Sequence, residues 1–162
     1  MTLVRHRGGG IIVLSFVVAL MLTVMPLPYW ADIVRPAWAA MVLIYWCLAL
    51  PERVGVGVGW TTGLLLDVLQ GTLLGQYALA LAIVAYLTLK LHRRVRVFPL
   101  WQQAVTVLML VVLEQLLVLW IKGITGQSPN VWLYLLPAAT STLLWPWVFV
   151  IMRNLRRHFR VT

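Results

Sequence analysis

The sequence carries very little charge. Only 10% of its 162 residues are Asp, Glu, Lys or Arg, whereas a soluble domain has about 25%. Hydrophobic residues make up 62% of the chain, so the polar side chains are too few to cover the surface of a water-soluble core. These proportions exclude the ordinary soluble classes and predict a single membrane-embedded domain over residues 1–162.

Residues that commonly perform catalysis are scarce. Cys47 is the only cysteine, which excludes an internal disulfide, and it stands in an apolar run where it should pack as a small hydrophobe. Each of the three histidines lies next to a basic cluster at a helix end. The residues before Asp67 are leucines, so the Gly-x-Gly-Asp pattern of intramembrane aspartyl proteases is absent. The sequence therefore predicts no enzymatic activity, no cofactor and no metal site.

Long apolar runs recur along the chain. A membrane-spanning helix needs about 20 apolar residues to cross about 30 Å of hydrocarbon. The candidate spans are residues 10–28, 36–51, 54–70, 75–92, 100–122 and 131–152. The break between the third and fourth spans depends on Gly71 and Gly75, and five helices with a re-entrant segment is the main alternative. We predict an all-α integral membrane protein with six transmembrane helices in a compact bundle.

The basic residues are distributed unevenly between the predicted loops. With the N-terminus in the cytoplasm, eleven of the 13 Lys and Arg face the cytoplasm, and only Arg35 and Lys122 face out. Both termini are therefore predicted to be cytoplasmic. The net charge of +9 is then mainly a topology signal and gives no reason to expect a nucleic acid partner.

Two cytoplasmic clusters are nevertheless candidate contacts for anionic lipids or a cytoplasmic protein, because each basic residue near an anionic surface contributes about 1 kcal/mol. They comprise Arg93, Arg94, Arg96, Arg153, Arg156 and Arg157. Four tryptophans stand near predicted helix ends, where an indole keeps its ring apolar and its N–H hydrated. These are Trp30, Trp101, Trp120 and Trp132.

Two carboxylates fall inside predicted spans. A charge near the bilayer centre costs at least about 2.5–3.5 kcal/mol, so Asp67 and Glu114 need a reason to be there. Counting at about 1.5 Å per residue puts both roughly 20 Å from the inner end, where they could share one outward-facing polar site. Three interpretations of Asp67 remain open. It caps backbone N–H groups or forms an ion pair at the glycine-rich break, it lines a ligand pocket open to the outside, or it meets a partner's membrane segment.

Small residues recur every four positions around Asp67. Gly59, Gly63, Gly71 and Gly75 follow this spacing, and Ala78 and Ala82 continue it. A stripe of small residues lets another helix approach closely. The stripe predicts either internal helix packing or a seam for a partner or a second copy of the chain. Gly71 is expected to end the third helix, and Pro146 is expected to kink the sixth.

Four segments together resemble a known family. They are "RPAWAAMVLIYWCLALPERVGVG" (35–57), "GLLLDVLQGTLLG" (63–75), "LWQQA" (100–104) and "LWPWVFVIMR" (144–153). In this order and over this length they resemble the rod-shape-determining MreD family in its proteobacterial form. None of the four is a chemical motif, so the resemblance carries no catalytic residues.

The resemblance implies a multi-pass component of the bacterial inner membrane that acts in synthesis of the lateral cell wall. It implies MreC, a single-span protein with a periplasmic domain, as partner. It also implies association with the filament protein MreB, the glycosyltransferase RodA and the transpeptidase partner of RodA. The implied fold is similar to the six-helix substrate-binding components of energy-coupling-factor transporters.

Our leading hypothesis from the sequence is a non-enzymatic scaffold that binds MreC. The expected contacts are the seams at Gly59/Gly63 and Ala78/Ala82, with Asp67 and Glu114 as outer polar anchors beside Arg35 and Lys122. The alternative is a module that binds a small molecule or a lipid-linked precursor in an outward-facing pocket at Asp67 and Glu114. In a third hypothesis, Arg93, Arg94 and Arg96 dock MreB.

Overall fold

The computed structural model describes residues 9–26, 28, 30, 35–51, 54–71, 74–124, 126 and 131–158, with side chains in the last helix from residue 135 onward. These residues form the helices α1 (Gly9–Val24), α3 (Trp38–Ala49), α4 (Val56–Gln70), α5 (Gln76–Val95), α6 (Leu100–Ile124) and α7 (Val131–His158). Each helix lies over one of the six apolar ranges of the sequence. The predicted all-α class with six helices is confirmed.

Two glycines set the boundary between α4 and α5. Gly71 has φ 68° and ends α4 in the left-handed conformation, with its N–H donating to the carbonyl of Asp67. Gly75 has φ 98° and immediately precedes α5. A side chain at either position would be strained in this conformation, so the expected role of Gly71 as a helix terminator is confirmed.

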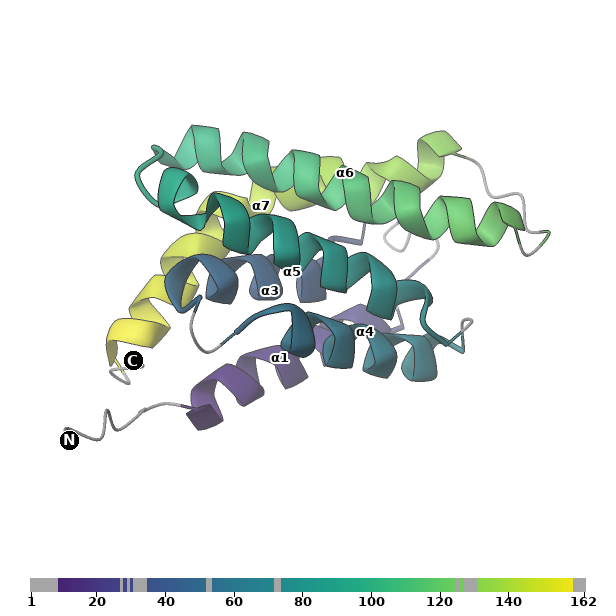
Figure 1. Cartoon of the computed structure of the whole chain (residues 1–162), viewed down its shortest axis with the longest axis horizontal. Helices are drawn as coiled ribbons and strands as arrows, with labels where there is room; N and C mark the ends of the chain where they lie inside the picture. Colours follow the sequence, from purple (N-terminus) through teal and green to yellow (C-terminus); the bar gives the residue numbers. More distant parts are fainter. Residues whose placement is uncertain are drawn as a thin grey trace.

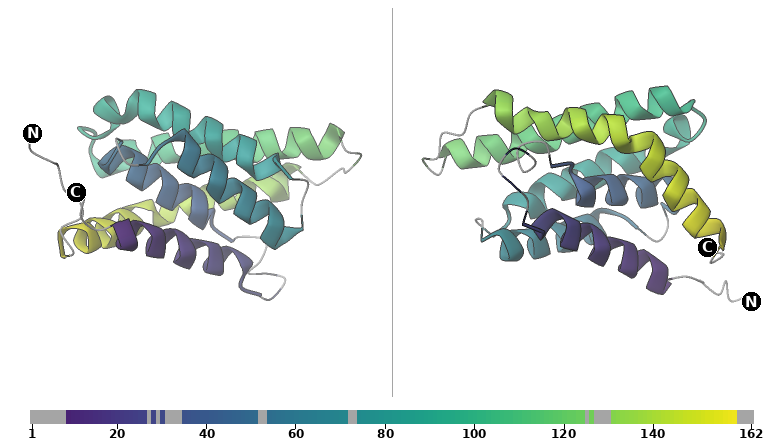
Figure 2. Two further views of the ribbon diagram at one scale, coloured as in Figure 1. Left: turned by 60° about the horizontal axis from the view of Figure 1, so that its bottom comes forward. Right: turned by 180° about the vertical axis from the view of Figure 1, so that it is seen from behind.

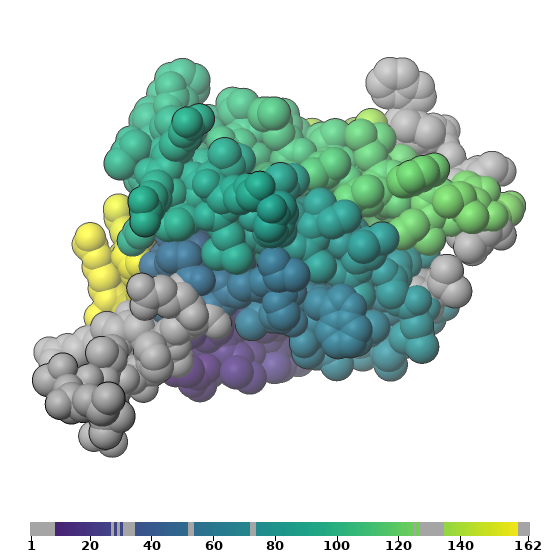
Figure 3. All heavy atoms as spheres, in the orientation of Figure 1, coloured from purple at the N-terminus to yellow at the C-terminus, as the bar shows by residue number. Residues whose placement is uncertain are grey.

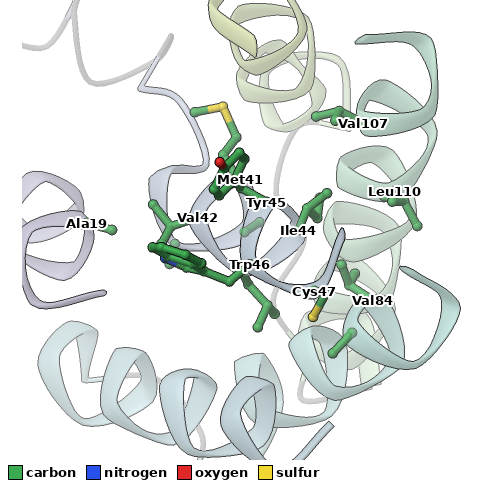
Figure 4. Packing of buried hydrophobic residues seen from close by; sticks show 14 of the residues in the cluster. Ala19, Met41, Val42, Ile44, Tyr45, Trp46, Cys47, Val84, Val107 and Leu110 are labelled. Atoms are coloured by element: carbon green, nitrogen blue, oxygen red, sulfur yellow. The ribbon is translucent and has the colours of Figure 1, made fainter. Parts of the chain in front are cut away.

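Helix α3 is the centre of the bundle. Every residue from Ala39 to Leu48 is buried, and α3 contacts α1, α5, α6 and α7. Figure 4 shows Trp46 and Ile44 of α3 on different sides of the helix, among Ala19 of α1, Val84 of α5 and Val107 of α6. Twelve residues are only about 18 Å long. The shortest helix is thus the core, surrounded by the longer ones, and the expected burial of Cys47 is confirmed.

Buried hydrogen bonds fasten α3 to its neighbours at both ends. The indole N–H of Trp46 donates to Ser15 Oγ of α1 at 2.8 Å, and Ser15 in turn donates to the carbonyl of Ile12. At the start of α3, the backbone N–H of Ala37 donates to Ser141 Oγ of α7 at 2.9 Å. These bonds satisfy polar groups that would be costly to leave unpaired in an apolar interior.

The basic ends of several helices lie together. The start of α1, the turn between α5 and α6, and the end of α7 are at the same end of the bundle (Figure 1). Figure 2 shows α7 running beside α6 and then bending away in its second half. Pro137 and Pro146 both lie inside this helix, and proline removes a backbone hydrogen bond and displaces the preceding turn. The bend agrees with the kink expected from the sequence.

The surface is apolar where a soluble protein would be polar. Along α6, the exposed side chains include Trp101, Met109 and Trp120, whereas Gln103, Glu114 and Gln115 are buried. Figure 3 shows one face of the molecule, on which residues of α4, α5 and α6 lie at the surface. Polar side chains turned inward and apolar ones turned outward fit a hydrocarbon solvent.

Length and hydropathy together single out two helices. Within the described residues, α6 and the 135–158 part of α7 are long and apolar enough to cross a membrane, while α1 and α3 are apolar but shorter.

Candidate partner-binding site

Asp67 holds the first turn of α5. Its carboxylate accepts hydrogen bonds from the backbone N–H groups of Gly75 at 2.9 Å, Tyr77 at 3.0 Å and Ala78 at 3.4 Å. The first N–H groups of a helix have no partner within that helix, and the helix dipole makes this end positive. The buried carboxylate of Asp67, on α4, accepts hydrogen bonds from these N–H groups and places a negative charge beside the positive end of α5. Of the three interpretations, the capping role is the one that the geometry supports.

The small-residue seam is closed by the chain's own helix. A Cβ atom added at Gly63 would lie 2.3 Å from Ala78 Cα, and one at Gly59 would lie 2.9 Å from the carbonyl oxygen of Leu81. Gly59, Gly63 and Ala78 are buried. The backbone of α5 occupies the space at Gly59 and Gly63, which fits the interpretation of the stripe as internal helix packing, and a seam for a partner's helix stays a prediction. Ala82, on the same helix, is only half-buried.

The outer cations are also placed by the structure. Arg35 donates from its guanidinium to the carbonyls of Thr23 and Met25 at the end of α1, where a cation complements the negative end of the helix dipole. Lys122 is half-buried in the last turn of α6. Arg35 therefore stabilises the end of α1 instead of standing as a separate outer contact.

Glu114 is buried within α6. It lies on the buried face of α6 and is 3% exposed, and its Oε2 atom has no hydrogen-bond partner among the described residues. The structure thus places Asp67 in the last turn of α4 and Glu114 on the buried face of α6. Neither residue lines the two cavities that we describe, so the outward pocket expected at this pair gains no support from them.

A lateral groove lies between α5 and α6. Its volume is about 620 Å³, and its lining is almost entirely apolar. Leu87 and Leu91 of α5 and Met109, Leu113 and Leu116 of α6 form much of the lining. Arg94 lines it near the α5–α6 turn. We call this the α5–α6 groove. Residues of both helices leave this part of the apolar surface hollow, which the sequence pattern did not reveal.

The predicted cytoplasmic arginines gather at one end of the bundle. Arg93, Arg94 and Arg96 are exposed at the end of α5. On α7, Arg157 is exposed while Arg153 and Arg156 are half-buried, and the guanidinium of Arg153 lies 5.7 Å from the ring centroid of Phe149. The two clusters expected from the sequence are therefore neighbours at the same end of the molecule (Figure 1).

The inverted polarity of α6 and the helical architecture fit a membrane protein. The profile of the family described as rod shape-determining protein MreD matches residues 5–155. The rod shape-determining protein MreD of Haemophilus influenzae is 36% identical over 146 residues, which cover 90% of this chain and 90% of that relative. The chain belongs to the MreD family. This is a shape-determining, structural family that is not known for enzymatic activity.

No solved structure matches the chain. The expected likeness to transporter substrate-binding components therefore stays a prediction.

Proposed function

We propose that the chain is a multi-pass scaffold of the bacterial inner membrane that binds MreC during synthesis of the lateral cell wall. It acts by position and without catalysis, holding the single transmembrane helix of MreC against its own surface. The single observation that carries the proposal is the α5–α6 groove. MreB, RodA and the transpeptidase partner of RodA are further partners of the proposed assembly.

Two features support six spans with both ends in the cytoplasm. The start of α1, the α5–α6 turn and the end of α7 share one end of the bundle (Figures 1 and 2), and this end carries most of the basic residues. Trp101 and Trp120 are exposed near opposite ends of α6. At about 1.5 Å per residue their separation is roughly 28 Å, close to the hydrocarbon thickness of about 30 Å.

The α5–α6 groove suits an apolar helix. Its lining on α6 extends from Thr106 to Leu116, about 15 Å along the helix. The Thr106 hydroxyl already donates to the carbonyl of Gln102, and the charged lining residue Arg94 is exposed near the α5–α6 turn, so the middle of the groove requires no polar group from a partner. Association inside a membrane depends on close packing, and a hollow between two helices offers a docked helix more contact than a convex face does.

The test fills the groove. Met109→Trp and Leu113→Trp, each expressed with MreC and purified in mild detergent, should reduce copurified MreC about tenfold, since overpacking costs about 1–3 kcal/mol. Matched controls are Val68→Trp on α4 and Leu143→Trp on α7, which replace residues that are 66% and 79% exposed. These controls should retain MreC.

Full retention of MreC by both groove variants, at normal membrane levels, would remove the groove from the proposal. Equal losses in the groove variants and the controls would show that any large exposed side chain disturbs the complex. The sites of these variants avoid Asp67 and Gly63, whose replacement is expected to act on folding first.

A further inference from the structure

A second cavity lies at the end of the bundle that holds the α5–α6 turn. Its volume is about 150 Å³, and its polar lining comes from Tyr45 of α3, Arg96, Gln103 of α6 and Arg156 of α7. Leu48 and Phe149 supply apolar walls. No acidic side chain is among the described residues that line it. We call it the inner cavity.

The inner cavity concentrates positive charge. Arg96 and Arg156 both line it, and the charges of Arg156, Arg153 and Arg157 act on the Tyr45 hydroxyl. Arg153 is held nearby on the ring of Phe149. Positive groups gathered in a partly enclosed space raise the local potential and repel one another. A bound anion would remove this repulsion.

Gln103, which lines the same cavity, carries an acceptor without a hydrogen-bond partner among the described residues. It is 4% exposed. Its Nε2 donates to the carbonyl of Val95 at 3.1 Å and to that of Phe98 at 3.4 Å. Because the amide nitrogen is engaged by two carbonyls, the opposite atom must be the oxygen. That oxygen, Oε1, is buried and has no partner in the described part of the chain. Buried polar atoms normally have one, so Gln103 offers an acceptor to a donor that enters the cavity, beside the two arginines that attract an anion.

We propose that the inner cavity binds a glycerol phosphate group, presented as the headgroup of phosphatidylglycerol. Arg96 and Arg156 pair with the phosphate, for which the guanidinium geometry is suited. Gln103 Oε1 accepts a hydrogen bond from a hydroxyl of the glycerol. A volume of about 150 Å³ accommodates a phosphate with a small alcohol.

The same chemistry is found in soluble glycerol phosphate, and the position of the cavity favours the lipid. Its lining includes residues near the ends of α3 and α5 and near the start of α6, and the proposed topology puts lipid headgroups at this end of the bundle. The apolar residues Leu48 and Phe149 line it beside the arginines. This inference does not depend on MreC, because none of the polar residues named here lines the α5–α6 groove.

The experiment is native mass spectrometry of the detergent-purified full chain titrated with phosphatidylglycerol. The double variant Arg96→Gln/Arg156→Gln should bind the lipid about 10- to 30-fold more weakly than the original chain. The matched control Lys90→Gln/Arg93→Gln removes the same charge from exposed positions that do not line the cavity and should bind normally. Equal weakening of both double variants, or no weakening of either, would overturn the proposal.

Two further ligands test the remaining parts. Phosphatidylmethanol has the same charge but no headgroup hydroxyl, so it should bind the original chain more weakly than phosphatidylglycerol. Equal binding of the two lipids would contradict the role of Gln103. Soluble glycerol phosphate at millimolar concentration should not displace the lipid. If soluble glycerol phosphate displaces the lipid, and this displacement depends on Arg96 and Arg156, the proposal that a lipid supplies the group is wrong.

Discussion

Asp67 is a fully buried carboxylate in an apolar helix, and its three backbone donors explain how it is tolerated there. The oxygens Oδ1 and Oδ2 are both used, each accepting at least one N–H. Asparagine would keep the shape but replace one acceptor by an NH₂ group that faces donors. These contacts lie within the chain, so they give Asp67 a role in folding that requires no partner.

Asp67→Asn should lower the free energy of unfolding by about 1–3 kcal/mol, because it leaves buried backbone N–H groups unpaired. The measurement is the thermal unfolding midpoint in detergent. The control is Gln70→Ala, at an exposed position of the same helix. An unfolding midpoint for Asp67→Asn that equals the original would contradict the capping role.

Gly63 and Gly57 form a matched pair on α4. A methyl group at Gly63 would meet the backbone of Ala78 at 2.3 Å, while one at Gly57 would meet nothing within 4 Å. Gly63→Ala should cost about 2–3 kcal/mol through overpacking. Gly57→Ala should be neutral, or stabilise by up to about 1 kcal/mol through the higher helix propensity of alanine. Unfolding in detergent measures both, and similar values for the two variants would refute the close approach of α4 and α5.

At the scale of the elements, α3 has the most neighbours and the least access to lipid. Because α3 is central, contacts with other helices hold its ends in place. At its start, the N–H of Ala37 donates a hydrogen bond to Ser141 Oγ of α7. Ser141 also donates to the carbonyl of Pro137. Pro137 lies inside the helix, so the serine lies one turn beyond a position where the regular bonding of α7 is interrupted.

Ser141→Ala should destabilise the bundle by about 1 kcal/mol, because the partly buried N–H of Ala37 would lose its acceptor. The neighbouring Thr140→Ala is the control, since Thr140 bonds only to the carbonyl of Leu136 in its own helix and should stay within about 0.5 kcal/mol. Protease resistance of the purified protein measures the difference. Equal resistance of the two variants would show that the α3–α7 bond contributes nothing.

At the scale of the whole molecule, the proposed topology predicts which turns can be reached from outside the cell. Cys47 is buried, so Cys47→Ala gives a background without cysteine. Leu74→Cys and Ile124→Cys introduce thiols at exposed outer positions, and Val97→Cys introduces one in the exposed α5–α6 turn. A membrane-impermeant maleimide applied to spheroplasts should label the first two and spare the third. Labelling of Val97→Cys in sealed cells would refute the orientation.

Much of the fold follows from local properties of the sequence. Apolar runs long enough for helices, separated by glycine, proline and basic residues, predicted six helices. The position of Gly71 predicted the end of α4 because a left-handed cap favours glycine. The capping role of Asp67 was one of the interpretations that the sequence left open. It could be foreseen because the backbone N–H groups that Asp67 binds follow it closely in the chain.

The tertiary structure decided what depends on distant parts of the chain. Ala37 and Ser141 are 104 positions apart, and no local pattern pairs them. The small-residue stripe alone could serve either a partner or the chain itself, and only the position of α5 showed that Gly63 is already occupied. The α5–α6 groove and the inner cavity have the same origin, because a hollow is formed by the side chains of several helices. The sequence by itself determined the helices and their membrane character through hydropathy and backbone preference, whereas packing between helices decided which surfaces remain for other molecules.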